Sequence, residues 1–259
     1  MALRPATELD AAPLVSLWAD VFGDPPELAE AFLRRLPALG FGWAAVEKDR
    51  VLGAAYGVDA LDLNGEKCLY LYAVAVRPEA RGKGLGAALS QAVWTTGSER
   101  GARYRCTEPA EPSLFAWYHR ILGTDCVLCR EGTELVSAPL TSVRPIAAAE
   151  YAARRDALLV GQPQVRHALA ALSYEEDNCR LFGGALFAAE GGIAAASIEE
   201  GTAVVRECIG PEPERLAASV GAALGCERVT LLRCADAGTP FLAGDRPLPP
   251  GTIWNLAFD

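Results

Sequence analysis

Arginine, lysine and three glycines stand close together in the segment Arg81-Gly82-Lys83-Gly84-Leu85-Gly86. Glycine permits a positive φ and a close approach of the backbone, so successive amide N–H groups can converge on phosphate oxygens. Arg81 and Lys83 would add positive charge beside those amides. These residue types at this spacing predict an anion site, and in particular a site for a pyrophosphate.

The flanking segments place this turn between a strand and a helix. Residues 69–76 form a continuous apolar run of strand length, and Leu85, Leu89 and Val93 recur downstream at helical spacing. The helix N-terminus would present the positive end of its dipole to the bound anion. The segment fits neither the G-x-x-x-x-G-K-[ST] loop nor the G-x-G-x-x-G loop, which disfavours a nucleotide-binding protein.

The order strand, Arg-x-x-Gly-x-Gly, helix resembles the acyl-CoA signature of the GNAT acetyltransferase superfamily. The other predicted elements follow the order of that family: a strand at residues 3–7, a helix ending near Phe22, hairpins turning at residues 48–50 and at Asn64-Gly65, a strand at residues 103–107, and a helix from residue 109. The resemblance covers residues 1–138 as one acetyltransferase domain. It implies an α/β (α+β) fold with a mixed, twisted sheet flanked by helices.

The resemblance also implies acetyl-CoA as the co-substrate and no metal ion. In this family the pantetheine arm lies between two splayed parallel strands, where it bonds like an added strand. Main-chain groups of Val74 and Val76 would take that role here, and a backbone N–H near Val74 would stabilise the tetrahedral oxyanion. The pyrophosphate would bind the turn formed by Arg81, Gly82, Lys83, Gly84, Leu85 and Gly86.

Acyl transfer from a thioester needs an acid for the departing thiolate, and the family commonly uses a tyrosine on the helix after the fifth strand. Counting forward from residues 109–111 places this tyrosine at Tyr118, whereas counting back from Gly123 places the position at His119. We favour Tyr118, because the start of a helix sets its face and an extra residue is more easily accommodated at its end. A structural role for Tyr118 in the core is the alternative, since it lies in an apolar helical stripe.

The base that removes the proton of the amine is less clearly indicated, because residues 69–76 carry no carboxylate. Four candidates remain: Glu108, Glu111, His119 and the carboxylate of Asp259. A carboxylate before a helix is also a favourable charge at the helix N-terminus, which is the simpler role for Glu108 and Glu111. Ordered water could serve in place of a single strong base.

The second half of the chain looks like a degenerate copy of the first. Residues 143–146 resemble residues 3–6, residues 188–195 resemble residues 45–52, and residues 203–206 resemble residues 74–77. Glutamates and prolines at residues 207–214 stand where the glycine turn would be, and they would repel a pyrophosphate and remove amide donors. We therefore expect a second, smaller GNAT-like domain at residues 142–259 that does not bind CoA.

Composition limits the classes of partner. The 259 residues are 51% hydrophobic, and 33 acidic against 24 basic residues give a net charge of −9, which disfavours nucleic acid and anionic membrane surfaces. The eight cysteines show no disulfide pattern, and the pair Cys126 and Cys129 lacks a second pair with zinc-ligand spacing, so no metal site is expected. We expect a cytoplasmic protein, with a homodimer as one option.

These features together predict an acetyl-CoA-dependent N-acetyltransferase that acts by direct attack of an amine in a ternary complex. The acceptor could be a small-molecule or peptide amine, and the sequence does not choose between them. Trp18, Phe22, Phe32 and Trp43 could line an apolar acceptor pocket, although a place in the core explains at least half of them. The alternative function is a catalytically silent, CoA-binding regulatory or assembly module.

Overall fold

The computed structural model of the protein describes residues 1–235 and 237–256. The chain divides into two compact units. The first unit comprises residues 1–127 and 241–247, and the second comprises residues 128–240 and the residues from 248 onward. The chain therefore returns to the first unit for one short segment near its end. The domain boundary between residues 138 and 142 stays a prediction.

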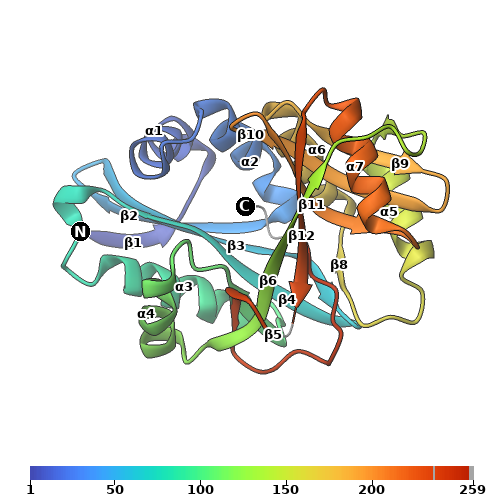
Figure 1. The fold of residues 1–259 in the computed structure, drawn as a ribbon. Coiled ribbons are helices and arrows are strands. Elements are labelled where there is room, and N and C mark those ends of the chain that lie inside the picture. Colours follow the sequence, from blue (N-terminus) through green and yellow to red (C-terminus); the bar gives the residue numbers. More distant parts are fainter. Residues whose placement is uncertain (236, 257–259) are drawn as a thin grey trace. The chain divides into compact units, whose positions relative to one another are not determined.

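The first unit is a mixed sheet with helices on both faces (Figure 1). Its elements, in chain order, are β1 (Ala2–Pro5), η1 (Glu8–Asp10), α1 (Ala11–Phe22), α2 (Pro26–Leu39), β2 (Gly40–Glu47), β3 (Arg50–Leu63), β4 (Glu66–Val76), η2 (Pro78–Ala80), α3 (Leu85–Glu99), β5 (Tyr104–Thr107), α4 (Pro112–Leu122) and β13 (Thr239–Gly244). The strand order is β1-β2-β3-β4-β5-β13, in which only β4 and β5 are parallel. The predicted fold class is confirmed.

Two hairpin turns set the register of the central strands. Lys48 and Asp49 between β2 and β3 have φ values of 48° and 64°, and Asn64 and Gly65 between β3 and β4 have φ values of 52° and 90°. Turns with two consecutive positive φ values match the twist of the flanking strands. Both turns were predicted from the sequence, and they align β3 between β2 and β4.

The two faces of this sheet have different cores. On the face covered by α3 and α4, leucines and valines of these helices pack against apolar residues of β2, β3 and β4. On the face covered by α1 and α2, the core is aromatic: Trp18 and Phe32 pack against Tyr56 and Tyr72 with ring centroids 5.0–6.0 Å apart. The two helix pairs are thus fixed independently on opposite faces.

The second unit repeats this arrangement. Its elements are β6 (Asp125–Val136), β7 (Arg144–Ile146), α5 (Ala148–Leu158), β8 (Val165–His167), α6 (Leu169–Leu181), β9 (Ala185–Ala189), β10 (Gly192–Glu199), β11 (Thr202–Ile209), α7 (Pro213–Ala223) and β12 (Arg228–Ala235). The strand order β7-β9-β10-β11-β12-β6 matches β1-β2-β3-β4-β5-β13, and again only the fourth and fifth strands, β11 and β12, are parallel. A second, smaller lobe of the same topology is therefore present.

A β-bulge in the second unit corrects one detail of the predicted repeat. In the β10–β11 pair, Ala195 faces Glu207 and Ala196 faces Val205, so Arg206 is an extra residue in β11. The first unit has its bulge at the equivalent place in β4, where Ala75 occupies the position of Glu207. The strands of the repeat match as predicted, but the residue-by-residue alignment is shifted. Glu207 belongs to the strand and not to the linker.

Glu207 is the centre of a buried polar network in the second unit. Its carboxylate accepts hydrogen bonds from Nε and Nη2 of Arg155 at 3.0 and 3.1 Å and from the hydroxyl of Tyr151 at 2.9 Å. Arg155 is 2% exposed, and Glu207 is not exposed at all. Burial, followed by the charge of Arg155, lowers the pKa of the nearby His167 to about 4, so that this histidine is neutral at pH 7.

Candidate active site

The parallel strands β4 and β5 separate part of the way along their length. They pair from Cys68 opposite Tyr104 to Leu71 opposite Thr107, where β5 ends, whereas β4 continues to Val76. At the last paired position the hydroxyl of Thr107 donates a hydrogen bond of 2.9 Å to the carbonyl of Leu71. Beyond this fork, one edge of β4 faces no strand among the described residues.

A bulge in β4 lies directly beyond the fork. Ala54 faces Ala75 and Tyr56 faces Tyr72, so two residues of β4, Ala73 and Val74, stand opposite one residue of β3. Ala73 has a φ of 48°, which is the left-handed region that residues other than glycine rarely adopt. Such bulges redirect the backbone and are frequent next to active sites. Val74, whose N–H is the predicted oxyanion donor, therefore lies outside the regular pairing of β4 with β3.

The glycine turn that follows β4 is exposed and ends at the start of α3. Gly82 and Gly84 have φ values of 75° and 76°, and Gly84 is the N-cap residue of α3 without a side-chain cap. Residues 81–84 are all exposed. The turn therefore leaves the first amides of α3 exposed to solvent, and their role in binding an anion stays a prediction.

The two basic residues of the turn are held by backbone carbonyls. Nε of Arg81 donates to the carbonyl of Val76 at 3.0 Å, and Nζ of Lys83 lies 3.5 Å from the carbonyl of Glu79. The terminal nitrogens of Arg81 make no hydrogen bond with any described residue, so they are available to a ligand. Both cations lie at the end of β4 at which the open edge finishes.

Helix α4 brings Tyr118 to the fork. The helix begins at Pro112 and ends before Gly123, which has a φ of 69°. Tyr118 is 6% exposed, and its hydroxyl lies close enough to the side chain of Thr107, the last residue of β5, for the two to interact. Burial raises the pKa of Tyr118 to about 12, and the interaction with Thr107 offsets only part of this effect. The phenol is therefore fully protonated at neutral pH.

His119 is turned away from the fork, toward solvent and the C-terminal end of α4. Its side chain is 64% exposed, and Nδ1 lies 3.0 Å from the carbonyl of Thr124 and 3.0 Å from Oδ1 of Asp125. These contacts fix the histidine at the C-terminal end of the helix. Of the two positions left open by the sequence, the structure thus places only Tyr118 at the fork.

The carboxylate candidates differ in position. Glu108 is half-buried and directly follows Thr107, so it stands next to the fork. Glu111 is the exposed N-cap residue of α4, and its carboxylate accepts a hydrogen bond from the hydroxyl of Ser113. Asp259 lies outside the described residues. The fork therefore gathers Glu108 with Tyr118, whereas Glu111 and His119 lie elsewhere on α4.

The four aromatic residues predicted near the acceptor do not form one pocket. Trp18 and Phe32 are buried in the aromatic core beneath α1 and α2, with exposed fractions of 3% and 0%. Phe22 is 40% exposed at the end of α1. Trp43 packs on the other face of the sheet, where its Nε1 donates to Thr96. A role in the core accounts for three of the four.

Two contacts in this region could not be predicted from the sequence. The sequence predicts Thr107 only as the end of a strand, whereas its hydroxyl donates to Leu71 on β4 and its side chain interacts with the hydroxyl of Tyr118. Gly86 was read as part of the anion turn, but an added Cβ would lie 3.6 Å from the ring of Trp117 on α4. Gly86 therefore also allows α4 to approach α3, and this role can be recognised only once the contact between the two helices is known.

The described residues were also searched for metal ligands and for membrane-spanning helices. Among residues 1–235 and 237–256 there is no group of three or more histidine, cysteine, aspartate or glutamate side chains that could hold a metal ion. All eight cysteines are free, and Cys126 and Cys129 lie on β6. None of the described helices is both long enough and apolar enough to cross a membrane.

Comparisons with known proteins agree with this geometry. Residues 8–124 match the acetyltransferase (GNAT) family. No curated protein sequence matches the chain. The matched segment contains the fork, the bulge, the glycine turn and Tyr118.

Solved structures resemble the chain over both units. A probable N-acyltransferase from Enterococcus faecalis V583 is 12% identical, with a TM-score of 0.71 over 94% of this chain and 72% of that one. A GCN5-related N-acetyltransferase from Kribbella flavida is 18% identical, with a TM-score of 0.68 over 94% and 70%. Eis1 from Mycobacterium abscessus is 14% identical, with a TM-score of 0.63 over 96% and 74%. At these identities the likeness shows a shared fold. The segment from residue 8 to residue 124, somewhat less than half of the chain, is thus similar to the GNAT acetyltransferase family.

Proposed function

We propose that the protein is an acetyl-CoA-dependent N-acetyltransferase in which an amine attacks the thioester directly in a ternary complex. One observation carries this proposal: a buried tyrosine hydroxyl lies at the fork of two parallel strands, and the exposed glycine turn follows on the longer of these strands. A thioester ligand with a long polar arm and a pyrophosphate needs both features at such a separation.

The glycine turn is proposed to bind the pyrophosphate of CoA. The open amides at the start of α3, the left-handed Gly82 and Gly84, and the free guanidinium end of Arg81 support this role. The pantetheine arm would add to the open edge of β4 along Val74 and Val76. This arrangement would bring the thioester to the bulge, beside Tyr118.

The chemistry then follows from the groups at the fork. The amine nitrogen forms a bond to the carbonyl carbon, the C–S bond breaks, and its electron pair remains on the sulfur. The backbone N–H of Val74 would stabilise the oxyanion, and Tyr118 would give its proton to the sulfur. The proton lost by the amine would pass through water to Glu108, and the phenolate would regain a proton from solvent.

Tyr118, with a pKa of about 12, can give its proton to the CoA thiolate only if the environment of the fork also raises the basicity of that thiolate. A thiolate in water is too weak a base to take a proton from such a phenol, since a free thiol has a pKa near 8.5. Burial changes this comparison. Cys106, one residue before the fork, has a pKa raised well above its usual range, and burial is the main cause. A CoA thiolate released at this depth would gain basicity for the same reason, which brings the two groups closer to a match.

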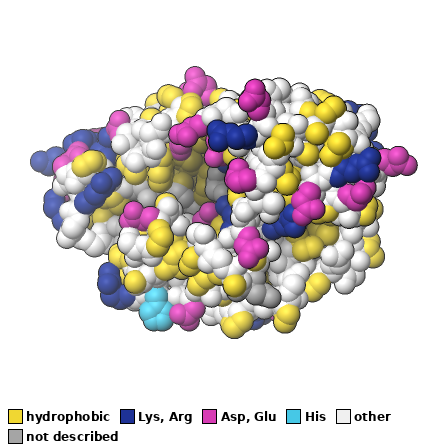
Figure 2. All heavy atoms as spheres, in the orientation of Figure 1, with side chains coloured by type: hydrophobic (Ala, Val, Ile, Leu, Met, Phe, Trp, Pro, Cys, Tyr) yellow, Lys and Arg dark blue, Asp and Glu magenta, His cyan; other side chains and the backbone are white. Residues whose placement is uncertain are grey.

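The second unit is proposed to enclose the acceptor or to support assembly, because it lacks a glycine turn. Only residues 210–212 separate β11 from α7, compared with residues 77–84 between β4 and α3. The acceptor is proposed to be a small-molecule or peptide amine. A reducing, cytoplasmic setting suits the eight free cysteines. On the face drawn in Figure 2, acidic and basic side chains are interspersed, and with the net charge of −9 this supports neither a nucleic acid nor an anionic membrane as a partner.

Ligand-induced thermal stabilisation tests the cofactor site. We expect acetyl-CoA and CoA, but not ATP, to raise the melting temperature, and Gly84→Glu to abolish this shift. Gly101→Glu is the matched control, because Gly101 also has a positive φ, 91°, with open space around its Cα, and it lies at the other end of α3. The two variants share strain and charge and differ only in position. Equal responses of both variants to CoA would contradict the assignment of the turn.

The alternative is a CoA-binding module without catalysis, which the absence of a carboxylate in residues 69–76 favours. Release of CoA from acetyl-CoA, measured by chromatography, separates the two functions. The acceptor panel would contain a polyamine, an aminoglycoside, an arylalkylamine and a peptide with a free N-terminus. Turnover with any of them supports the enzyme, and CoA binding without turnover across the panel supports the module.

A further inference from the structure

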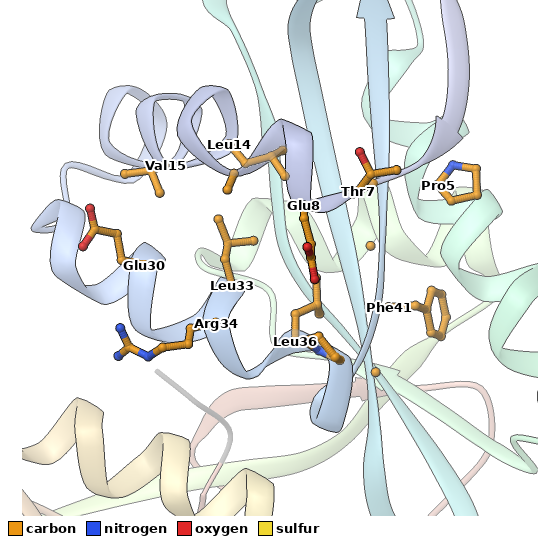
Figure 3. A pocket seen from close by; sticks show the side chains of 15 residues that line it. Pro5, Thr7, Glu8, Leu14, Val15, Glu30, Leu33, Arg34, Leu36 and Phe41 are labelled. Carbon is orange, nitrogen blue, oxygen red and sulfur yellow. The ribbon is translucent and has the colours of Figure 1, made fainter.

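A cavity of about 680 Å³ lies in the first unit, away from the fork. The end of β1, η1, α1, α2 and the start of β2 line it, and none of its lining residues belongs to β4, β5, α3 or α4 (Figure 3). Leu14, Leu33 and Leu36 form apolar walls on the two helices. The volume is within the range of about 300–1,000 Å³ that is typical of small-molecule sites.

Two glycines of β2 keep the floor of this cavity free of side chains. An added Cβ at Gly40 would lie 1.8 Å from the carbonyl oxygen of Gly57, and one at Gly42 would lie 2.9 Å from the ring of Tyr56. Any larger residue at these positions would collide with β3. The close packing of β2 on β3 therefore requires glycine at these two lining positions, so neither contributes a side chain to the cavity wall.

Three charged side chains line the cavity. Glu30 and Arg34 are one turn apart on α2, so their charges can compensate each other. Glu8 comes from η1 on the other side, and it is an exposed residue at the edge of the cavity (Figure 3). None of the three makes a hydrogen bond or an ion pair with another described residue. The local net charge is therefore −1, and the uncompensated charge is that of Glu8.

We propose that this cavity binds an amphiphilic organic cation, with an apolar body between α1 and α2 and an ammonium group beside Glu8. The apolar walls select the body of the ligand, because burial of apolar surface drives its binding. Glu8 selects the sign of the head group, and the net charge of −9 of the chain acts in the same direction. The site is separate from that of CoA and does not depend on the proposed acetyl transfer.

Calorimetric titration of the full chain with two probes of the same shape tests the selectivity. The probes are 4-phenylbutylammonium and 4-phenylbutyrate, which share ring and chain and differ in charge. We expect the cation to bind roughly fivefold more tightly than the anion, as one partly exposed ion pair allows. Glu8→Gln should remove most of this preference. Glu27→Gln is the control, because Glu27 is an exposed glutamate of α2 that does not line the cavity.

The location is tested by filling the cavity. Leu33→Trp should abolish binding of the cation, and Ala11→Phe provides a second filling variant at an exposed position of α1, which the fold tolerates more easily. CoA should leave the affinity for the cation unchanged. The proposal would be overturned by equal affinity for the two probes, by binding that survives both filling variants, or by competition between the cation and CoA.

Discussion

Tyr118→Phe removes one hydroxyl from the fork and tests its role in catalysis. We expect kcat to fall by about 100-fold or more, which is the usual contribution of a positioned acid, with little change in KM for acetyl-CoA. The reason is that the phenol would act on the sulfur only as the C–S bond breaks. Because burial raises its pKa to about 12, Tyr118 stays protonated, and the pH profile of the wild type should show no loss from this group below about pH 10.

The cost of the same substitution in stability should be small. The hydroxyl of Thr107 keeps its hydrogen bond to the carbonyl of Leu71 at 2.9 Å, so the substitution leaves no buried donor without a partner. The loss of the polar contact between Tyr118 and Thr107 should lower the free energy of unfolding by at most about 1 kcal/mol. In a chain of this length the melting temperature would fall by roughly 2–4 °C. The activity loss would therefore not come from unfolding.

Tyr151→Phe is the control for this argument. Tyr151 is also a buried tyrosine with a side-chain partner, since its hydroxyl donates to Glu207 at 2.9 Å in the second unit. Loss of this hydrogen bond to a charged group should destabilise the protein by about 1.5–3 kcal/mol, more than Tyr118→Phe, yet leave kcat unchanged. Initial rates of CoA release and urea denaturation measure the two effects. A kcat of Tyr118→Phe within threefold of the wild type would refute the acid role.

Three further predictions concern stability. Arg155→Met should lower the free energy of unfolding by about 3–5 kcal/mol in urea titrations, because it leaves the buried carboxylate of Glu207 without its ion-pair partner. Arg154→Met, whose ion pair is on the more exposed side of the same helix, should lower it by less than about 1 kcal/mol. Gly97→Ala should be less stable than Gly86→Ala by about 1–2 kcal/mol. The Cβ added at Gly97 would lie 2.3 Å from the buried side chain of Leu69, whereas the one added at Gly86 would lie no closer than 3.6 Å to its nearest neighbour. Equal melting temperatures of the two variants would contradict this packing. The hydrogen-bonded ion pair with Arg4 lowers the pKa of Asp10 from 3.8 to about 2. The folded-state pKa is below the unfolded value, so this pair contributes at most about 2 kcal/mol above pH 5 and loses about half of it by pH 3; the difference in stability between wild type and Asp10→Asn should shrink over that interval.

Local patterns were sufficient for much of the first unit. The turns at residues 48–49 and 64–65 carry residues that tolerate a positive φ, and the glycine turn between a strand and a helix is a short-range pattern. Counting forward from residues 109–111 favours Tyr118 over His119, and of the two only Tyr118 is buried beside Thr107, while its catalytic role stays a prediction. Each of these features depends on residues within about one turn of one another.

Long-range pairing was beyond a single sequence. β13 lies next to β5 through Ala243 and Gly244, more than a hundred residues away from Thr107 and Cys106, and no local pattern encodes that register. The bulge of β4 could not be seen either, because its left-handed residue is Ala73, and alanine carries no preference for that conformation. Glu207 was assigned to an acidic linker, since its partner Arg155 is distant in sequence.

The two repeats separate what the fold provides from what the proposed function requires. Both have a bulge in the fourth strand beside a diverging parallel pair, so this opening is a property of the topology and by itself indicates no activity. In the second unit the position equivalent to Ala75 is Glu207, whose charge is neutralised by Arg155 within the protein, and only three residues link the strand to α7. An anion that entered there would meet a buried carboxylate and no free amides of a glycine turn. The first unit keeps small residues at the bulge and adds the glycine turn and Tyr118, and these differences are the reason why the thioester site is proposed for this unit.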